Sequence, residues 1–390
     1  MKKRIICLIL VLIMPLSCLT WVQAKAAKED DYKDISELLD SCIEENIAVY
    51  EANTKTFIGG KNGDKKRYIS HLTKLMTALI AYDHIKSGKI GYDIKLKTSE
   101  YANSMQGVQI WLDIGEEITV DELIKAITIS NANDAAVVLA EGCCGSEDRF
   151  VELMNKRAKS LGMKNTSFAD STGIDEKNIS TANDMAILAG ELAKNNVFDE
   201  YFKMRIAEVG CKGSQLVTQN KLIGNYKGCC GYKSCYSENG GDMLCVAAKQ
   251  RDMVVCAVLL GGESEDKKFY DAKSVMNFSF THYEVYYPEI PEGIFEEIPV
   301  EHGQKQSAGV EICDGRNIII KRGTYRQIYT MFEKAEILTA PIRKGDKVGK
   351  LMFYDDKGEI LRCSITADED VKKMDFFYAF KCLLYNLFNV

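Results

Sequence analysis

The sequence predicts an α/β domain followed by a smaller β-rich domain, and three observations support this division. Between residues 70 and 86, apolar residues recur at spacings of three and four, which is typical of a helix that faces a core. Residues 243–261 form two runs rich in Val, Leu and Cys around Lys249-Gln250-Arg251-Asp252, and they predict two strands. From about Tyr283 onward, short β-type runs alternate with turns, so we expect a second, β-rich unit there.

The other elements are predicted from the same periodicities. Residues 30–46 are polar and predict a leader helix, residues 47–58 predict a strand, and the glycine-rich residues 59–63 predict the turn after it. Three-to-four spacing predicts further helices, which are expected at residues 120–129, after Asn133, at 147–160 and at 181–195. The β-type runs of the second unit are 309–312, 317–321, 335–338, 347–354 and 359–366.

The first 24 residues have the pattern of a secretory signal peptide. Lys2, Lys3 and Arg4 precede an apolar stretch at residues 5–16, and Val22-Gln23-Ala24 provides a cleavage site. The apolar stretch is shorter than the roughly 20 residues of a membrane span, and an uncleaved N-terminal anchor is the alternative. We therefore expect an exported protein, at the outer face of the cytoplasmic membrane or in the cell wall.

Composition and residue spacing argue against two kinds of ligand, nucleic acids and metal ions. The chain has 50 Lys and Arg against 56 Asp and Glu, a formal net charge of −6, and no basic cluster. Because phosphate recognition needs clustered Lys and Arg, no nucleic-acid partner is expected. No metal site is expected either, because His84, His282 and His302 lack ligand spacing and the 14 cysteines form no zinc-type pairs.

Residues 371–390 predict an amphipathic helix at the C-terminus. Aromatic and leucine side chains lie along one side, and they are Phe376, Phe377, Phe380, Leu383, Leu384, Leu387 and Phe388. Such a helix is typical of a segment that lies in a membrane interface, so we expect it to act as an anchor on the membrane surface. The alternative is a helix that packs on its own β-rich domain.

Three separated segments are the candidates for chemistry. They are residues 68–77 (Tyr-Ile-Ser-His-Leu-Thr-Lys-Leu-Met-Thr), residues 130–136 (Ser-Asn-Ala-Asn-Asp-Ala-Ala) and residues 231–237 (Gly-Tyr-Lys-Ser-Cys-Tyr-Ser). In order and spacing they resemble the SxxK, SxN and KTG motifs of the low-molecular-mass penicillin-binding proteins, which are serine-type D-alanyl-D-alanine carboxypeptidases.

The resemblance covers nearly all of the mature chain. Residues 168–174 and 180–186 are similar to the connecting segments of that family, and residues 338–349 to its C-terminal β domain. It implies a β-lactamase/transpeptidase-like fold, with an antiparallel sheet flanked by helices. We predict a signal peptide at 1–24, a carboxypeptidase-like domain at 25–283, a β-rich domain at 284–370 and an amphipathic membrane-anchor helix at 371–390.

The resemblance also implies a reaction. In this family a serine attacks the carbonyl between two D-alanines, and a lysine three residues later takes its proton. The second motif helps proton transfer and holds the substrate amide, while the third receives the terminal carboxylate. The implied ligand is the D-Ala-D-Ala end of a peptidoglycan stem peptide, or a β-lactam, and no cofactor is implied. Lys74, Asn133 and Lys233 match these motifs, and Ser234 replaces a threonine conservatively.

Three positions depart from the family pattern. His71 stands at the position of the nucleophilic serine, Asn131 at the serine of the second motif, and Cys235 at a glycine that leaves space beside the substrate. These substitutions favour a carboxypeptidase homologue that is catalytically impaired, with His71 as a buried, hydrogen-bonded side chain.

The alternative is an active enzyme whose nucleophile is relocated to Ser70 or Cys235. A step of one residue turns a helix by about 100°, so we expect Ser70 to point away from the reacting carbonyl.

Overall fold

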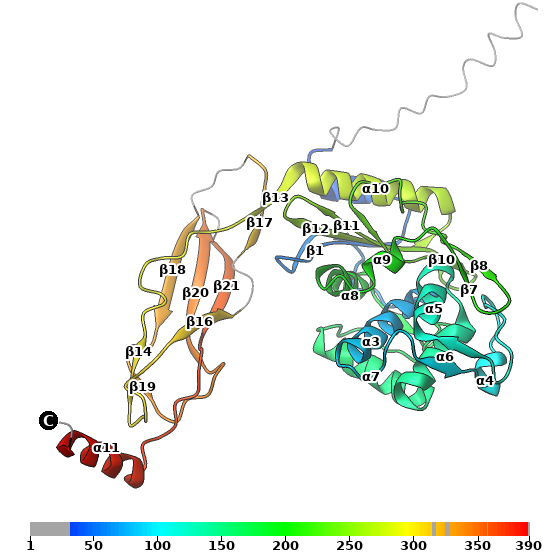
Figure 1. The fold of residues 1–390 in the computed structure, drawn as a ribbon. Coiled ribbons are helices and arrows are strands. Elements are labelled where there is room, and N and C mark those ends of the chain that lie inside the picture. Colours follow the sequence, from blue (N-terminus) through cyan, green and yellow to red (C-terminus); the bar gives the residue numbers. More distant parts are fainter. Residues whose placement is uncertain (1–31, 314–316, 324–327, 357, 389–390) are drawn as a thin grey trace, which may run out of the picture.

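The computed structural model describes residues 32–313, 317–323, 328–356 and 358–388 (Figure 1). The predicted signal peptide at residues 1–24 lies outside the described residues. The first domain is built on an antiparallel sheet with the strand order β10-β11-β12-β1-β2, and β9 pairs with β11 beside β10. The strands are β1 (Asn46–Glu51), β2 (Thr56–Lys61), β9 (Cys229–Gly231), β10 (Ser234–Ser237), β11 (Gly241–Gln250) and β12 (Met253–Gly262).

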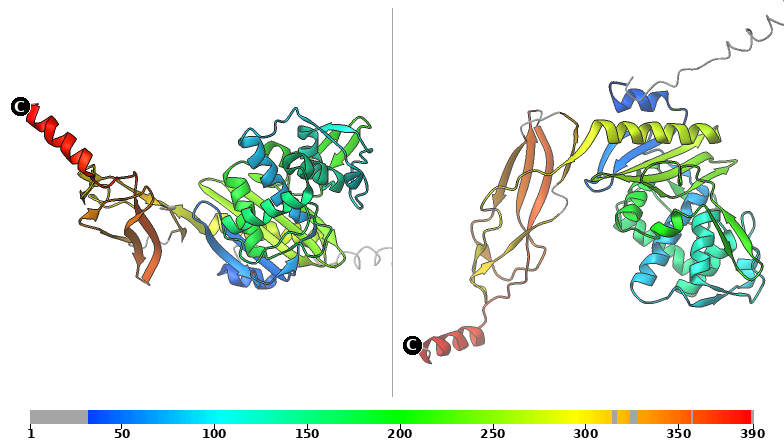
Figure 2. Two further views of the ribbon diagram at one scale, coloured as in Figure 1. Left: turned by 90° about the horizontal axis from the view of Figure 1, so that it is seen from below. Right: turned by 45° about the horizontal axis from the view of Figure 1, so that its top comes forward.

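The central strands are hydrophobic because both faces of the sheet are covered. Every residue of β12 is buried, which explains its continuous apolar run. On one face lie α2 (Ile35–Ser41) and α10 (Glu265–His282), whose side chains share a core with alternate residues of β1, β11 and β12. The fold class predicted from the sequence, an antiparallel sheet flanked by helices, is confirmed (Figures 1 and 2).

The helices that bear the motifs lie on the opposite face of the sheet (Figure 1). Helix α8 (Ala182–Lys194) packs directly on β1 and β12. Beyond it lie α3 (Lys74–Lys86), α5 (Val120–Lys125), α6 (Asn133–Cys144) and α7 (Glu147–Ser160). Shorter elements complete this part: β3 (Arg67–Tyr68), β4 (Lys95–Lys97), α4 (Glu100–Asn103), β5 (Glu117–Thr119), β6 (Ile179–Ser180), α9 (Asp199–Phe202), β7 (Ile206–Val209) and β8 (Ser214–Val217).

Two irregular helical turns position the first two motifs. The turn η2 (Ser70–Thr73) is a 3-10 helix that leads into α3, so the predicted helix at 70–86 begins with a tighter turn. The segment η3 (Ala126–Ser130) is a π-helix that continues α5 and ends at Asn131 in the left-handed conformation, with φ 67°. Asparagine tolerates this conformation better than most residues, and the reversal allows α6 to begin at Asn133.

The predicted strand and turn at residues 47–63 need correction. The chain forms a hairpin, β1 and β2, whose turn lies at residues 52–55 rather than at the glycines. Gly59 and Gly60 lie inside β2, because α2 crosses the sheet there. A Cβ at Gly59 would lie 3.0 Å from side-chain atoms of Ile35 and Leu39. Gly59 therefore permits a close helix–strand approach, and α2 itself is shorter than the predicted leader helix at 30–46.

The β-rich second domain has its own core. Its main sheet has the order β16-β21-β20-β18, and a smaller sheet has the order β15-β14-β19. The bounds are β14 (Ile298–Glu301), β15 (Ser307–Ala308), β16 (Val310–Cys313), β17 (Ile318–Lys321), β18 (Tyr329–Lys334), β19 (Leu338–Thr339), β20 (Lys347–Asp355) and β21 (Gly358–Ala367). The strand predicted at 335–338 is wrong except for its last residue, because β18 ends at Lys334 and residues 335–337 connect it to β19.

A two-stranded ladder joins the domains. Strand β13 (Tyr283–Tyr286) directly follows α10 and pairs antiparallel with β17 of the second domain. Tyr283 belongs to the core beneath α10, and Ile319 of β17 packs against that core. The predicted division between residues 283 and 284 stays a prediction.

The C-terminal helix α11 comprises Phe376–Phe388 and begins later than the predicted residue 371. Val371 and Lys373 form isolated bridges with Ile342 and Gly303, which keeps the preceding residues extended on the second domain. The large apolar side chains at Phe376, Phe377 and Leu383 are exposed. Among the described residues, no helix is both long and apolar enough to cross a membrane.

Candidate active site

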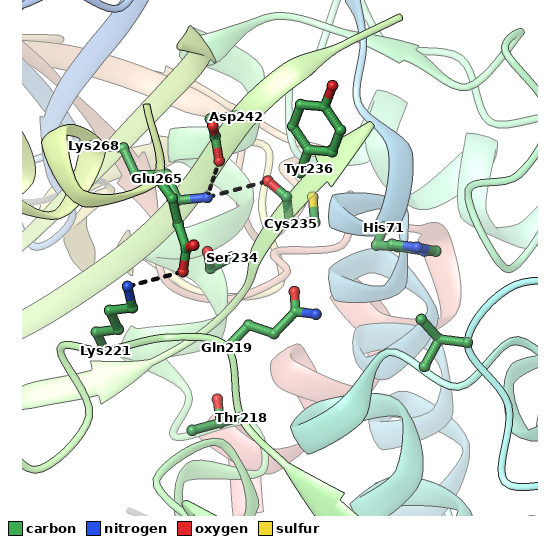
Figure 3. A pocket seen from close by; sticks show the side chains of 11 residues that line it. His71, Thr218, Gln219, Lys221, Ser234, Cys235, Tyr236, Asp242, Glu265 and Lys268 are labelled. Carbon is green, nitrogen blue, oxygen red and sulfur yellow. Dashed lines mark hydrogen bonds and ion pairs between the residues drawn. The ribbon is translucent and has the colours of Figure 1, made fainter. Parts of the chain in front are cut away.

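The first and third motif segments meet at one cavity of about 720 Å³, beside the second (Figure 3). His71 comes from η2, and Ser234, Cys235 and Tyr236 come from β10 at the edge of the sheet. Strand β10 packs against η2, which places the third motif beside the first. The cavity is lined by His71, Val108, Thr218, Gln219, Lys221, Ser234, Cys235, Tyr236, Asp242, Glu265 and Lys268.

Lys74 lies behind His71 at the centre of a hydrogen-bond network. Its ammonium nitrogen Nζ lies 2.6 Å from Asn133 Oδ1, 2.6 Å from the Thr172 carbonyl oxygen and 3.2 Å from His71 Nδ1. A lysine ammonium has three donors, so these partners use all of them. The i, i+3 spacing between His71 and Lys74 allows the contact, because both side chains project from one helical face.

Burial changes the protonation of both groups. Lys74 is fully buried, and this desolvation lowers its pKa to about 7. Burial and the nearby Lys74 and Lys233 charges lower the pKa of His71 to about 3. The imidazole is therefore neutral at neutral pH, and its Nδ1 lies within hydrogen-bond distance of the Lys74 Nζ, with the donor set by the imidazole tautomer. Lys74 keeps a pKa suited to a general base, but the atom three residues earlier is an imidazole nitrogen rather than a hydroxyl.

The second motif serves the network through Asn133. The Asn133 side chain accepts from Lys74 and donates through Nδ2 to the Gln106 carbonyl at 2.6 Å. Asn131 lies at the end of η3, where Nδ2 is 3.5 Å from the Ser234 carbonyl. The buried Oδ1 of Asn131 has no hydrogen-bond partner in the structure. The residue at the second serine position thus contacts β10 rather than Lys74.

Lys233 is also fully buried, beneath the cavity. Its Nζ donates to the carbonyls of Ile127 and of Thr128, the latter at 2.9 Å, so it joins β10 to η3. Burial lowers the pKa of Lys233 well below its ordinary value, and the charge of Lys74 lowers it further. Ser234, the next residue, lines the cavity directly. The third motif therefore places a buried lysine side chain under the cleft and a hydroxyl on its wall.

Cys235 fills the space that a glycine would leave open. Its side chain is only 2% exposed and belongs to the main core, yet it lines the cavity opposite His71 (Figure 3). Burial raises the pKa of the Cys235 thiol to about 11, although Lys268, Lys233 and Lys74 oppose this. The thiol is therefore protonated at neutral pH and is a poor nucleophile.

Ser70 lies outside the lining of this cavity and is buried, with φ at 45°. Its backbone carbonyl packs against Gly173, where an added Cβ would lie 2.0 Å from the Ser70 oxygen. Gly173 has φ 87°, and Asp170 Oδ1 accepts from the backbone N–H groups of Thr172 and Gly173. The loop from Asp170 to Gly173 thus fixes the turn that bears His71.

Sequence reasoning missed a buried ion pair at the far wall of the cavity. Lys268 of α10 lies 2.5 Å from Asp242 and also contacts the Cys235 carbonyl oxygen at 3.4 Å (Figure 3). Lys221 pairs with Glu265 at 3.0 Å on the same side. No local pattern marks these pairs, because the two members of each pair lie 26 or more positions apart along the chain. Asp134 was also missed, although its carboxylate accepts the N–H groups of Ile110 and Leu112 and so orders the loop beside Val108.

This fold and the arrangement of its three motifs define a penicillin-interacting serine peptidase architecture. The family model for D-alanyl-D-alanine carboxypeptidase matches residues 40–264, and that for the C-terminal domain of penicillin-binding protein 5 matches residues 292–373. The chain therefore belongs to the D-alanyl-D-alanine carboxypeptidase family, as the motifs predict. It is 34% identical over 380 residues to the D-alanyl-D-alanine carboxypeptidase DacF of Bacillus subtilis, covering 96% of each chain. With DacC of Escherichia coli the identity is 28%, over 81% of each chain.

Solved structures show the same architecture. Penicillin-binding protein 5 of Haemophilus influenzae superposes with a TM-score of 0.74 at 24% identity, covering 85% of this chain and 98% of the other. Penicillin-binding protein D2 of Listeria monocytogenes, in its ampicillin-bound form, superposes with a TM-score of 0.56 at 25% identity. It covers 62% of this chain and 98% of its own. The two-domain fold predicted from the sequence is thereby confirmed.

Proposed function

We propose that this protein is a carboxypeptidase homologue of the cell wall that binds D-Ala-D-Ala ends of peptidoglycan stem peptides and is catalytically impaired. The observation that supports the proposal is the imidazole of His71 at the nucleophile position, 3.2 Å from Lys74. A general base remains in place, but it has no hydroxyl to activate. An acyl group transferred to an imidazole would also hydrolyse readily.

The relocated nucleophiles are less favourable than an impaired site. Ser70 is one residue away from the required position, and a misplacement of about 1 Å can already cost 10²-fold in rate. It is also absent from the lining of the cavity. Cys235 lines the cavity, but its raised pKa keeps it protonated. Both remain outcomes that a covalent-labelling experiment can detect.

Ligand binding would use the polar groups that remain. Ser234 presents a hydroxyl to the cavity, and Lys233 lies beneath it with its Nζ donating to two backbone carbonyls. A terminal carboxylate is the ligand group that such a site favours. The substituted third-motif residue, Cys235, narrows the cavity from the β10 side.

Incubation with a β-lactam followed by intact-mass spectrometry tests the proposal. We expect no stable adduct on the native protein at concentrations that label family members, because a β-lactam traps the motif serine. The variant His71→Ser should acylate slowly, since Lys74, Asn133 and Lys233 remain. Adding Asn131→Ser and Cys235→Gly should raise its rate. A β-lactam mass mapped to native Ser70 or Cys235 would overturn the impaired-site proposal.

We further propose that α11 holds the exported protein on the outer face of the cytoplasmic membrane. The exposed aromatic side chains of the helix support this, because an interfacial helix buries such a face among lipid headgroups. Truncation after Met374 leaves both bridges of residues 371–373 in place and should release the protein from membranes. Retention of the truncated protein, with an uncleaved N-terminus, would identify residues 1–24 as the anchor.

A further inference from the structure

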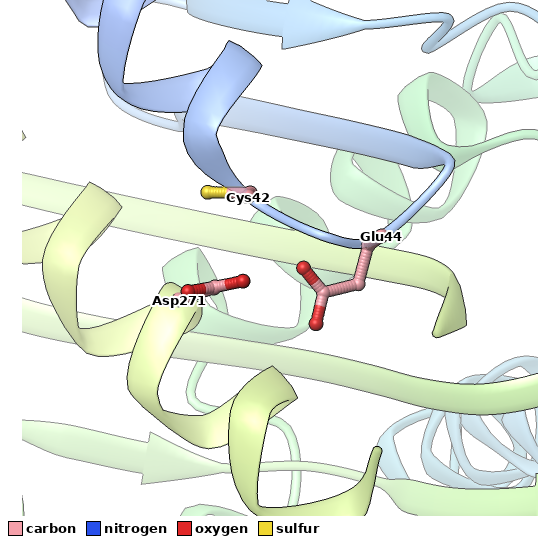
Figure 4. Close-up of side chains that lie close together, drawn as sticks. All are labelled: Cys42, Glu44 and Asp271. Atoms are coloured by element: carbon pink, nitrogen blue, oxygen red, sulfur yellow. The ribbon is translucent and has the colours of Figure 1, made fainter. Parts of the chain in front are cut away.

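A cluster of three potential ligands lies on the face of the sheet opposite the cleft. Cys42 follows α2, Glu44 lies in the loop before β1, and Asp271 projects from α10 (Figure 4). Their ligand atoms all lie within 4.8 Å of one another, and all three residues are buried. Among the residues that the structure describes, this is the one such group of His, Cys, Asp and Glu side chains. No histidine belongs to this cluster among the described residues, so the spacing of the histidines in the sequence could not predict it.

Glu44 makes this cluster unusual. Its side chain is 0% exposed, and neither carboxylate oxygen has a hydrogen-bond partner in the structure. Figure 4 shows the carboxylate directed into the space between Cys42 and Asp271. A buried carboxylate without donors carries a large desolvation penalty. Burial, and then Asp271, raise the pKa of Glu44 to about 8.

Nearby hydrogen-bond donors and ammonium groups only partly offset the negative charge that the two carboxylates and the thiol can carry. Asp271 Oδ2 accepts from the Ile43 N–H at 3.2 Å, and Oδ1 lies 3.7 Å from the Lys267 ammonium. Lys61 donates to the backbone carbonyl of Cys42, and its charge only partly offsets the acids that surround the thiol. Cys42 Sγ donates a weak hydrogen bond to the Leu38 carbonyl, at 3.3 Å. Two carboxylates and a thiol therefore lie close together, with Lys267 beside Asp271 and Lys61 at the Cys42 backbone as the nearby ammonium groups.

The ligand set fits a borderline-soft divalent cation. Zn²⁺ accepts thiolate sulfur at about 2.3 Å and carboxylate oxygen at about 2.0–2.2 Å, usually in tetrahedral geometry. Such bond lengths place neighbouring ligand atoms about 3.5 Å apart, which small side-chain rotations would reach here. Magnesium and calcium prefer oxygen ligands alone, so the thiol disfavours them. With the thiol and both carboxyls ionised, a divalent cation together with Lys267 would balance the charge.

We propose that Cys42, Glu44 and Asp271 bind one zinc-class divalent cation. Its three protein ligands would join the N-terminal segment to α10, and water would complete the tetrahedron. The cation would hold α2 on the sheet, where Gly59 allows its close approach. This role is independent of the cleft and of the proposed ligand.

Titration of the reduced full-length protein with Co²⁺ and Zn²⁺ tests the site directly. We expect one ion per chain, a thiolate-to-cobalt charge-transfer absorption, and a melting temperature that rises with zinc concentration, because the ion binds the folded state. No ion bound by the folded native protein at micromolar concentration would overturn the proposal. This measurement needs no variant.

Variants then assign the ligands. Cys42→Ser should remove the charge-transfer absorption, and Glu44→Gln should weaken binding by at least about 100-fold, since loss of even outer partners costs 10–100-fold. The matched controls are Cys256→Ser and Glu51→Gln, which also alter fully buried groups. The Glu51 oxygens accept hydrogen bonds from Thr54 and Val254. Both controls should keep native metal binding even if they lose stability.

The competing arrangement is a proton shared between Glu44 and Asp271. In that case Glu44→Gln would preserve or raise stability, and zinc would leave the melting temperature of the native protein unchanged. That pair of results would overturn the proposal. If zinc stabilises the native protein and not Glu44→Gln, the cation assignment is supported.

Discussion

The base of the cleft and its wall differ in how their polar groups are used. The cleft base, which we define as Lys74, Asn133 and Lys233, is fully buried, and its side chains are hydrogen-bonded to one another or to carbonyls. The cleft wall, which we define as His71, Ser234, Cys235 and Tyr236, faces the cavity. The base matches the family motifs throughout, whereas the wall holds two of the three substitutions. The base is thus part of the packed interior, while the wall carries substitutions within the same architecture.

The largest effect should come from Gly173→Ala, which strains the turn that bears His71 and leads into Lys74. The new Cβ would lie 2.0 Å from the Ser70 carbonyl oxygen, and φ is 87°. We expect a loss of about 3–5 kcal/mol in the free energy of unfolding, because backbone must move. Gly162→Ala is the matched control, with φ at 80° and nothing within 4 Å. The control should lower the free energy of unfolding, measured in urea, by about 1 kcal/mol. Equal losses would show that the loop does not hold the turn.

Cys235→Gly removes a wall residue that is also part of the core. We expect about 2 kcal/mol of lost stability, from the vacated volume and from added glycine freedom. Binding of a D-Ala-D-Ala peptide, followed by calorimetry, should become tighter because the cavity opens. Cys245→Gly provides the comparison, since Cys245 is buried in β11 outside the cavity lining. It should lose stability with unchanged affinity, and a tighter complex in both variants would argue against crowding by Cys235.

Lys74→Met tests whether the pKa of the Lys74 side chain in the cleft base is lowered in the folded protein. Burial lowers the pKa of Lys74 to about 7, below its unfolded value of 10.5, so the unfolded chain binds more protons between these values. The contribution of Lys74 to stability therefore rises with pH in that window. Between pH 7 and 8.5 the native protein should gain about 1.5 kcal/mol relative to the variant. Parallel pH profiles in urea unfolding would mean that Lys74 stays charged.

Tyr236→Ala should have the smallest effect on stability. The side chain is 62% exposed and lines the cavity. We expect a change below about 0.5 kcal/mol in unfolding free energy, as is usual for exposed positions. Peptide affinity should nevertheless fall, because the ring forms part of the wall. A loss of stability without a loss of peptide affinity would mean that Tyr236 supports the fold, like the residues of the cleft base, and does not contact the ligand.

The fold was predictable where local pattern and tertiary packing agree. The helix at 147–160 and the strands around residues 249–252 lie where periodicity places them. The turn predicted at residues 59–63 was wrong because glycine favours a turn and also, as at Gly59, the close approach of a helix. The motif residues were found from spacing, but their partners were not. Thr172 binds Lys74 across 98 positions, and Lys268 of α10 reaches Asp242 of β11. Such contacts depend on the folded topology.

The antiparallel pairing of β13 with β17 determines how a mechanical force would be transmitted between the two domains. The second domain is tied to α10 by a hydrogen-bonded pair of strands, and Ile319 is packed into the neighbouring core. A pull applied at the C-terminal helix would therefore reach the first domain through a sheared strand pair rather than a slack tether. Strand pairs pulled along their length must break several hydrogen bonds together. The cleft should thus keep a fixed height above whatever surface holds the C-terminus.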